Sequence, residues 1–274
     1  MNSSDQRKKF QKEKERTDLF KVIHNRRSIR KFTDQAVPNF VLEKILKAGI
    51  RAPFAAQLYS IVYTRDKEKM NQLKKMGIYP TTQILMIFLI DCRKIEKIIL
   101  QRGYEYDYDD SMLLWLAIQD VTLVAENIIL AAEALGLGSV LLGGAPLLAE
   151  QIAKVFKLPP RVFPVVGLCL GYPDPEHLME IRPRFPLKFV AFEEFYSDLS
   201  ECDVQECMEA MDEGYITQGY YIKQKAKIPL KEGKDTIDYD TYSWSEHISR
   251  KFCQGFWAEE SVLAKLKKHG FNLE

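Results

Sequence analysis

Cations and one hydroxyl gather in a short stretch near the beginning of the chain, and their chemistry suits an anion. Arg26, Arg27, Ser28 and Arg30 stand almost side by side, followed by Lys31. Arginine holds a phosphate through a planar fork of donors, and a serine hydroxyl either caps a helix or bonds a phosphate oxygen. A run of cations is also typical of a solvated surface. The stretch alone therefore leaves both interpretations open.

A second basic stretch lies much later in the chain. Arg182 and Arg184 alternate with Pro183, and Pro186 follows two residues later. Prolines hold the backbone extended, so the two guanidinium groups are positioned in advance. This stretch is a second candidate anion site.

Paired glycines supply a third feature with possible chemistry. Gly143 and Gly144 follow Leu142 at the end of a short strand-like run. Glycines let a backbone approach a ligand and present its N–H groups, but they serve a plain tight turn equally well. The residues alone leave both interpretations open.

Packed elements must position these features. Apolar residues with helical spacing predict one helix that begins near residue 17 and delivers the first basic stretch, and a second helix over 41–50. Residues 59–64 and 84–90 predict strands, and the second is apolar without alternation. A strand buried on both faces requires helices on both sides of its sheet.

The longest patterned segment covers residues 111–135. Its polar residues recur about every seven positions and predict one polar stripe on a helix that is otherwise buried nearly all round, inside a domain or against a partner subunit. The stripe consists of Gln119, Asp120, Glu126, Asn127 and Glu133. Strands follow over 139–142 and 162–170, and Pro164 indicates an edge or irregular position for the latter.

Composition narrows the function classes. The 274 residues are 46% hydrophobic and 28% charged with a formal net charge of +1, which indicates a globular protein without the basic field of a nucleic-acid binder. The five cysteines form no CxxC pair and indicate a reducing compartment, hence a cytoplasmic location. Residues 1–16 lack the apolar core of a secretory signal, and we expect a flexible basic N-terminus with no membrane association.

The residue composition changes at residue 193, where aromatic residues become frequent and the periodic spacing of aliphatic residues weakens. We therefore predict a main domain over residues 17–192 and a C-terminal arm over 193–274 that packs on it or on a partner subunit.

Five short segments stand in the order seen in the nitroreductase superfamily, which the chain resembles. They are residues 27–32 (RSIRKF), 131–138 (AAEALGLG), 142–144 (LGG), 167–173 (GLCLGYP) and 182–186 (RPRFP). Residues 244–248 and 268–271 resemble the tail of the larger branch, the oxygen-insensitive NADPH nitroreductases and flavin reductase P type enzymes.

The resemblance implies an α+β fold of three layers, a central and mostly antiparallel sheet flanked by helices, in an intertwined homodimer with one FMN per active site. It implies ping-pong transfer of two electrons from NADPH or NADH to a small-molecule acceptor, with no protein acid or base required. By match to the family, the FMN contacts are Arg26, Arg27, Ser28, Arg30, Phe54, Gln57, Leu142, Gly143, Gly144, Arg182 and Arg184.

Three positions depart from the family pattern. Residues 53–57 lack the serines that the larger branch often places against the flavin, although Gln57 matches. Tyr79 stands where glutamine is common. Glu259 falls where members that prefer NADPH have an arginine, and an acid there would repel a 2′-phosphate. The choice between NADPH and NADH stays open.

The expected activity is reduction of nitroaromatics, quinones or free flavin. A flavin store or redox sensor with little turnover would carry the same motifs and is the main alternative, and reductive dehalogenation is a third. No metal site is expected, because the four histidines are scattered.

Overall fold

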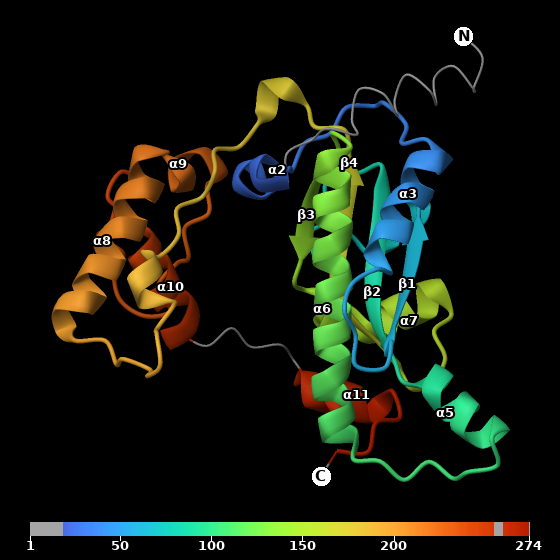
Figure 1. Cartoon of the computed structure of the whole chain (residues 1–274). Helices are drawn as coiled ribbons and strands as arrows, with labels where there is room; N and C mark the ends of the chain where they lie inside the picture. Colours follow the sequence, from blue (N-terminus) through green and yellow to red (C-terminus); the bar gives the residue numbers. More distant parts are fainter. Residues whose placement is uncertain (1–18, 255–259, 274) are drawn as a thin grey trace. The chain divides into compact units, whose positions relative to one another are not determined.

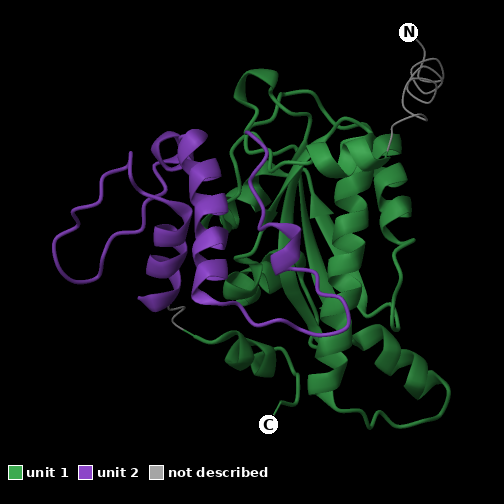
Figure 2. Ribbon diagram, turned by 60° about the vertical axis from the view of Figure 1, so that its left-hand side comes forward, with its two compact units in different colours: residues 1–179, 259–274 green, residues 180–258 purple. Residues whose placement is uncertain are grey.

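The computed structural model describes residues 19–254 and 260–273. The expected flexible N-terminus, residues 1–16, and Glu259 lie outside the described residues. The chain forms two compact units, residues 1–179 with 259–274 and residues 180–258 (Figure 2). The expected domain division at residues 192 and 193 stays a prediction.

Unit 1 is built around a four-stranded antiparallel sheet (Figure 1). The strands are β1 (Tyr59–Thr64), β2 (Ile84–Asp91), β3 (Gly138–Leu142) and β4 (Val162–Gly171). Their order in the sheet is β1-β2-β4-β3, so that β1 and β3 form the edges. The strands expected over 59–64 and 84–90 are confirmed almost to the residue.

Helices cover both faces of this sheet and complete three layers. The helices of unit 1 are α2 (Leu19–Asn25), α3 (Asn39–Gly49), α4 (Lys67–Gln72), α5 (Arg93–Gln101), α6 (Asp110–Ala134), α7 (Ala149–Phe156) and α11 (Val262–Lys268), with 3-10 turns η1 (Lys74–Met76), η2 (Ala145–Leu148) and η3 (Pro175–His177).

Alternating side chains of β2 divide the core between the two faces. Even-numbered residues from Ile84 to Ile90 pack with α3 and α6, whereas Leu85, Ile87 and Leu89 pack with α4, η1 and α7. Every residue of β2 is buried, as its continuous apolar sequence predicts. The expected α+β fold with a covered antiparallel sheet is therefore confirmed.

Pro164 lies in β4, which is a central strand and not an edge. The pairing of β2 with β4 shifts register between Phe88 and Leu89, opposite Pro164 and Val166. A β-bulge leaves one residue out of the ladder, and this accommodates a residue without an N–H group. The edge interpretation was thus wrong and the irregular one is confirmed.

Helix α6 begins at the N-cap Asp109, whose side chain accepts the N–H of Ser111, and is followed by Gly136 in the left-handed conformation. By length and composition it could cross a membrane, but its inner face packs on α3 and the sheet as a core helix does. Burial all round was wrong for the single chain: Trp115 is 65% exposed, and Met112, Ile118 and Leu123 are exposed beside it.

The expected polar stripe of α6 is divided between its two faces. Asp120 is buried and Asn127 donates to the carbonyl of Ala48 in α3, whereas Gln119 and Glu126 are exposed. Neighbouring residues on a helix lie about 100° apart, so Gln119 and Glu126 face solvent whereas Asp120 and Asn127, one position further along, turn toward the interior.

Unit 2 contains helices α8 (Glu201–Thr217), α9 (Tyr220–Gln224) and α10 (Trp244–Cys253), with the 3-10 turn η4 (Leu187–Phe189). Its interior is aromatic and ionic. The ring of Tyr221 contacts the rings of Tyr242 and His247, and the buried guanidinium of Arg250 bonds Asp235 and Glu246. Aromatic rings and a satisfied cation replace the aliphatic pattern that the sequence lacks there.

Candidate active site at the β3 edge of the sheet

Residues 26–32, the arginine segment, cross the end of the sheet beside β3. Ile29 and Phe32 are buried, and the N–H of Ile29 donates to the carbonyl of Ser139 in β3 at 2.8 Å. The N–H of Phe32 donates to Thr81 Oγ1 at 3.0 Å. Apolar anchors and backbone hydrogen bonds thus fix the segment from which the arginine side chains extend.

Glycine is required where this segment crosses the strands. A Cβ on Gly138 would lie 2.4 Å from Ile29 Cγ1, and one on Gly171 would lie 3.0 Å from the ring of Phe32. Both glycines are strand ends, and their missing side chains leave room for the anchors.

Arg30 supplies a buried donor that the described residues leave without a partner. Its Nε donates to the hydroxyl of Tyr79 at 3.0 Å, while its Nη1 is buried and finds no acceptor within the described parts of the chain. A buried guanidinium nitrogen without an acceptor is costly unless a ligand supplies one. The residues therefore fit an anionic group.

Arg26, Arg27 and Ser28 are half-buried, so the segment is not a freely solvated face. Arg27 Nη1 donates to the carbonyl of Met179 at 3.1 Å. The positive charges of Arg26 and Arg27 act on Glu133 in the last turn of α6, where burial nonetheless raises the pKa of the carboxyl to about 7.

The glycine turn, Gly143 and Gly144, lies at the other end of β3. Leu142 is buried, but a Cβ on Gly143 would meet nothing within 4 Å, and one on Gly144 would meet only the carbonyl oxygen of Met76, at 3.9 Å. The turn therefore faces open space. Four residue steps along the strand lead from Ser139 to Gly143, a distance of about 13 Å. This distance suits an elongated ligand with an anionic end.

Phe54 and Gln57 lie elsewhere in the same chain. Their loop, residues 53–58, leads into β1, the edge strand opposite β3, and three strand spacings of about 4.8 Å separate the edges. The loop also lies at the opposite end of the strands, because Tyr59 pairs with Ile90 whereas the arginine segment crosses near Gly138. Within a single chain these two residues are therefore far from the arginine segment, and three strand spacings separate their edge from the edge that carries the glycine turn.

Asp120 of α6 fixes this loop, a role that the sequence pattern did not reveal. Its carboxylate accepts the N–H groups of Ala55 at 2.6 Å, Ala56 at 3.3 Å and Leu58 at 2.9 Å. Phe54 stays 55% exposed, and Gln57 adopts a φ of 53°. An acid within an apolar helix was the available signal for such a buried contact.

Arg182 and Arg184 belong to unit 2, where its own groups hold them. Arg182 Nη1 donates to Gln218 Oε1 at 2.6 Å, and its guanidinium lies 3.9 Å from the ring centroid of Tyr220. Arg184 Nη1 donates to the carbonyl oxygens of Arg182 and Pro183. Their expected role at a phosphate stays a prediction.

A second polar centre in unit 1, also missed by sequence reasoning, surrounds Arg161. The guanidinium bonds Glu96 and Asp110, and Asp110 also accepts the N–H of Asn272 at 2.6 Å and the hydroxyl of Tyr106 at 2.9 Å. Although burial opposes it, these bonds hold the pKa of Asp110 below its usual range. A cavity of about 920 Å³ adjoins the network. The paired charges anchor the C-terminal residues to α6.

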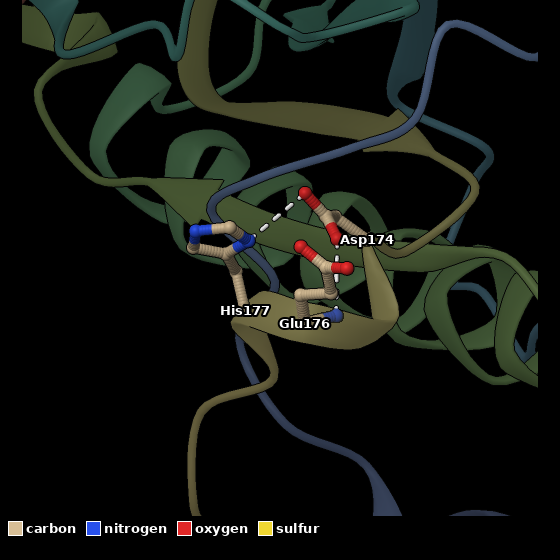
Figure 3. Close-up of side chains that lie close together, drawn as sticks. All are labelled: Asp174, Glu176 and His177. Atoms are coloured by element: carbon tan, nitrogen blue, oxygen red, sulfur yellow. Dashed lines mark hydrogen bonds and ion pairs between the residues drawn. The ribbon is translucent and has the colours of Figure 1, made fainter.

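Asp174, Glu176 and His177 form a small cluster that resembles a cation site (Figure 3). His177 Nδ1 lies 3.0 Å from Asp174 Oδ2, and Lys31 Nζ lies 3.4 Å from the same oxygen. The lysine already supplies the positive charge that the carboxylate would otherwise take from a metal ion. We therefore assign no metal ion to this cluster, and the expected lack of a metal site stays a prediction.

Known proteins share this fold. Residues 23–76 and 98–172 match the nitroreductase family. The crystal structure of nitroreductase A from Vibrio parahaemolyticus is 30% identical with a TM-score of 0.74, over 92% of this chain and 97% of that one. The NADPH-flavin oxidoreductase of Vibrio harveyi is 29% identical over 85% of this chain and 90% of its own length. The oxygen-insensitive NADPH nitroreductase of Salmonella typhimurium is 29% identical over 84% and 88%.

Proposed function

Because the chain belongs to the nitroreductase family, we propose that it is an FMN-dependent NAD(P)H oxidoreductase that reduces nitroaromatics, quinones or free flavin. The buried Nη1 of Arg30, which lacks an acceptor among the described residues, carries the proposal in this structure. When bound, FMN supplies transfer of two electrons from a reduced nicotinamide to the acceptor.

The arginine segment holds the phosphate in this proposal. Arg26, Arg27 and Arg30 donate charge-assisted hydrogen bonds, each worth about 1.5–3 kcal/mol, and Ser28 adds a hydroxyl. The fixed backbone of the segment supports this role, because anchored donors lose little freedom on binding.

The glycine turn lies beside the ring in the same proposal. Leu142, Gly143 and Gly144 present backbone and no side chain beyond the buried leucine, so the ring can approach closely. Electron transfer needs orientation and exclusion of competing reactions more than a protein acid or base.

A homodimer completes the site. Phe54 and Gln57 lie at the far edge of their own sheet, and in this proposal they reach the glycine turn of a second copy. The exposed apolar face of α6, with Trp115 at its centre, supplies a surface for that copy. The finer proposal is a symmetric dimer in which each site takes the arginine segment from one chain and loop 53–58 from the other.

The electron donor and the compartment are also proposals. The named relatives are NADPH enzymes, which supports NADPH, whereas an acid at position 259 would repel a 2′-phosphate. A cytoplasmic location is supported by the free cysteines Cys92, Cys169, Cys202, Cys207 and Cys253.

An anaerobic visible spectrum of the purified protein, loaded with FMN, tests the function. We expect the flavin band to bleach with NADPH or NADH and to return when a nitroaromatic is added. A flavin band that neither nucleotide bleaches would instead favour the flavin store or sensor. Failure to bind FMN would refute the proposal.

A further inference from the structure

Glu133 is an acid placed where the proposed function calls only for cations. It lies in the last turn of α6, half-buried, and its Oε1 is buried with no hydrogen-bond partner in the described parts of the chain. The helix C-terminus carries a partial negative charge, which disfavours a carboxylate there. A structural role would predict an ion pair, yet none joins Glu133 to a described cation within 4.0 Å.

The charges that act on Glu133 come from the arginine segment. Helix α6 packs against α2, α3 and strands β1 to β3, and Arg26 and Arg27, which follow α2, are the cations that act on the carboxyl. The other ionisable groups on those elements are exposed or lie at the far end of the sheet: Lys21, His24, Glu43, Lys44, Lys47, Tyr59, Tyr63 and Asp91.

We propose that Glu133 is a proton-linked counter-charge of the phosphate site, which takes up a proton when the FMN phosphate binds to the arginine segment. Glu133 is a positioning residue and not a catalytic one. The inference rests on the proposed function, because FMN is the anion. The carboxylate and the phosphate compete for the same two arginines, and protonation of the carboxyl relieves their repulsion.

The sign of the pH dependence follows from this competition. Without ligand the pKa of Glu133 is about 7, and a neighbouring dianion raises it further. Between these two pKa values the bound state holds one more proton than the free state, so FMN affinity falls as pH rises, by at most about tenfold per pH unit for a single proton. Ionisation of the phosphate itself, with a pKa of about 6, acts in the opposite direction and is nearly complete at the lower edge of that window.

Flavin fluorescence titrations between pH 7 and pH 9 test the inference on the full-length protein and its Glu133→Gln variant. We expect the wild-type Kd for FMN to rise with pH and the variant Kd to stay flat, which makes the variant about fivefold tighter at pH 8.5. Riboflavin, which lacks the phosphate, should bind both proteins without this dependence.

Calorimetry in two buffers of different ionisation enthalpy gives a second reading that needs no variant. At pH 7.5 the wild-type protein should take up a fraction of one proton per FMN and none per riboflavin. Parallel pH profiles in the two proteins, or no proton uptake, would overturn the inference while leaving the oxidoreductase assignment intact. Absence of FMN binding at every pH would overturn both.

Discussion

Two side chains at this site have buried polar atoms that lack a hydrogen-bond partner in the described parts of the chain. Arg30 keeps one nitrogen bonded to Tyr79 and another without an acceptor in the described structure, and Glu133 keeps a buried oxygen without a donor. The unpaired nitrogen and the unpaired oxygen each cost free energy before any ligand binds. In the proposed site an anion gives Arg30 an acceptor and a proton neutralises Glu133, so both costs fall together. Tyr79 is informative because glutamine is common at its position in the family.

Tyr79→Phe tests whether this hydroxyl orients Arg30. The variant leaves Arg30 Nε without its partner at 3.0 Å, and losing a hydrogen bond to a charged group costs about 1.5 kcal/mol or more, so we expect a roughly tenfold higher Kd for FMN. Flavin fluorescence measures it, with Tyr63→Phe, an exposed tyrosine of β1, as the control. An equal loss for riboflavin would count against a contact with the phosphate end.

Helices and strands position the site where another segment of the chain packs closely against them. The arginine segment reaches β3 because Gly138 and Gly171 have no side chain, and loop 53–58 keeps its form because Asp120 accepts three of its N–H groups. Both contacts are made by neighbours of the residues that would touch ligand, because Ile29 lies between Ser28 and Arg30, and Ala55 and Ala56 lie between Phe54 and Gln57. Binding residues depend here on groups that are remote in sequence.

Gly138→Ala should disturb the segment and the ligand together. The new Cβ lies 2.4 Å from Ile29 Cγ1 and 2.9 Å from Pro173 Cγ, so overpacking of about 1–3 kcal/mol is expected, with weaker FMN binding. In the control Gly167→Ala, the atom closest to the new Cβ is the flexible end of Met76 at 3.0 Å, followed by Leu142 Cβ at 3.4 Å and Ile87 Cδ1 at 3.5 Å, so much less overpacking is expected. Thermal unfolding and FMN titration report the two effects, and equal behaviour of both variants would contradict the expected crossing.

Patterns that are local in the sequence predicted most helices and strands. The pairing of strands in the sheet decided the features that the sequence left open. The continuous apolar run of β2 and the caps of α6 depend on neighbours in sequence, so both were predictable. Pro164 left an edge and an irregular position open because strand order is not local, and a list of motifs carries no information on which sheet edge loop 53–58 and the glycine turn each join. Asp120 was hidden in the predicted polar stripe, because its neighbour Gln119 has the same spacing but lies about 100° away on the exposed side of the helix.

At the scale of the whole molecule, the chain consists of two compact units with different interiors. Unit 1 has an aliphatic core on each face of its sheet, whereas unit 2 relies on Tyr221, Tyr242 and the ion pairs of Arg250. The exposed face of α6 and the distant loop 53–58 both lie in unit 1. The proposed dimer accounts for both features.

Trp115→Glu tests that pairing. A charge at the centre of the apolar face should prevent dimer formation, and FMN should be lost with it because loop 53–58 of the second copy is removed. Analytical ultracentrifugation gives the mass and absorbance gives the flavin content, with Trp115→Phe as the apolar control. A variant that stays dimeric would exclude this face of α6 as the interface.

The division of the site between the two edges of the sheet also has a genetic consequence. In the proposed dimer, a copy damaged at Arg30 and a copy damaged at Phe54 should each be inactive as homodimers, whereas a mixed dimer should carry both lesions in one site and leave the other intact. Random mixing makes half of the dimers mixed with one working site each, so about one quarter of the wild-type flavin capacity should return. Two defective alleles expressed in one cell would therefore complement each other.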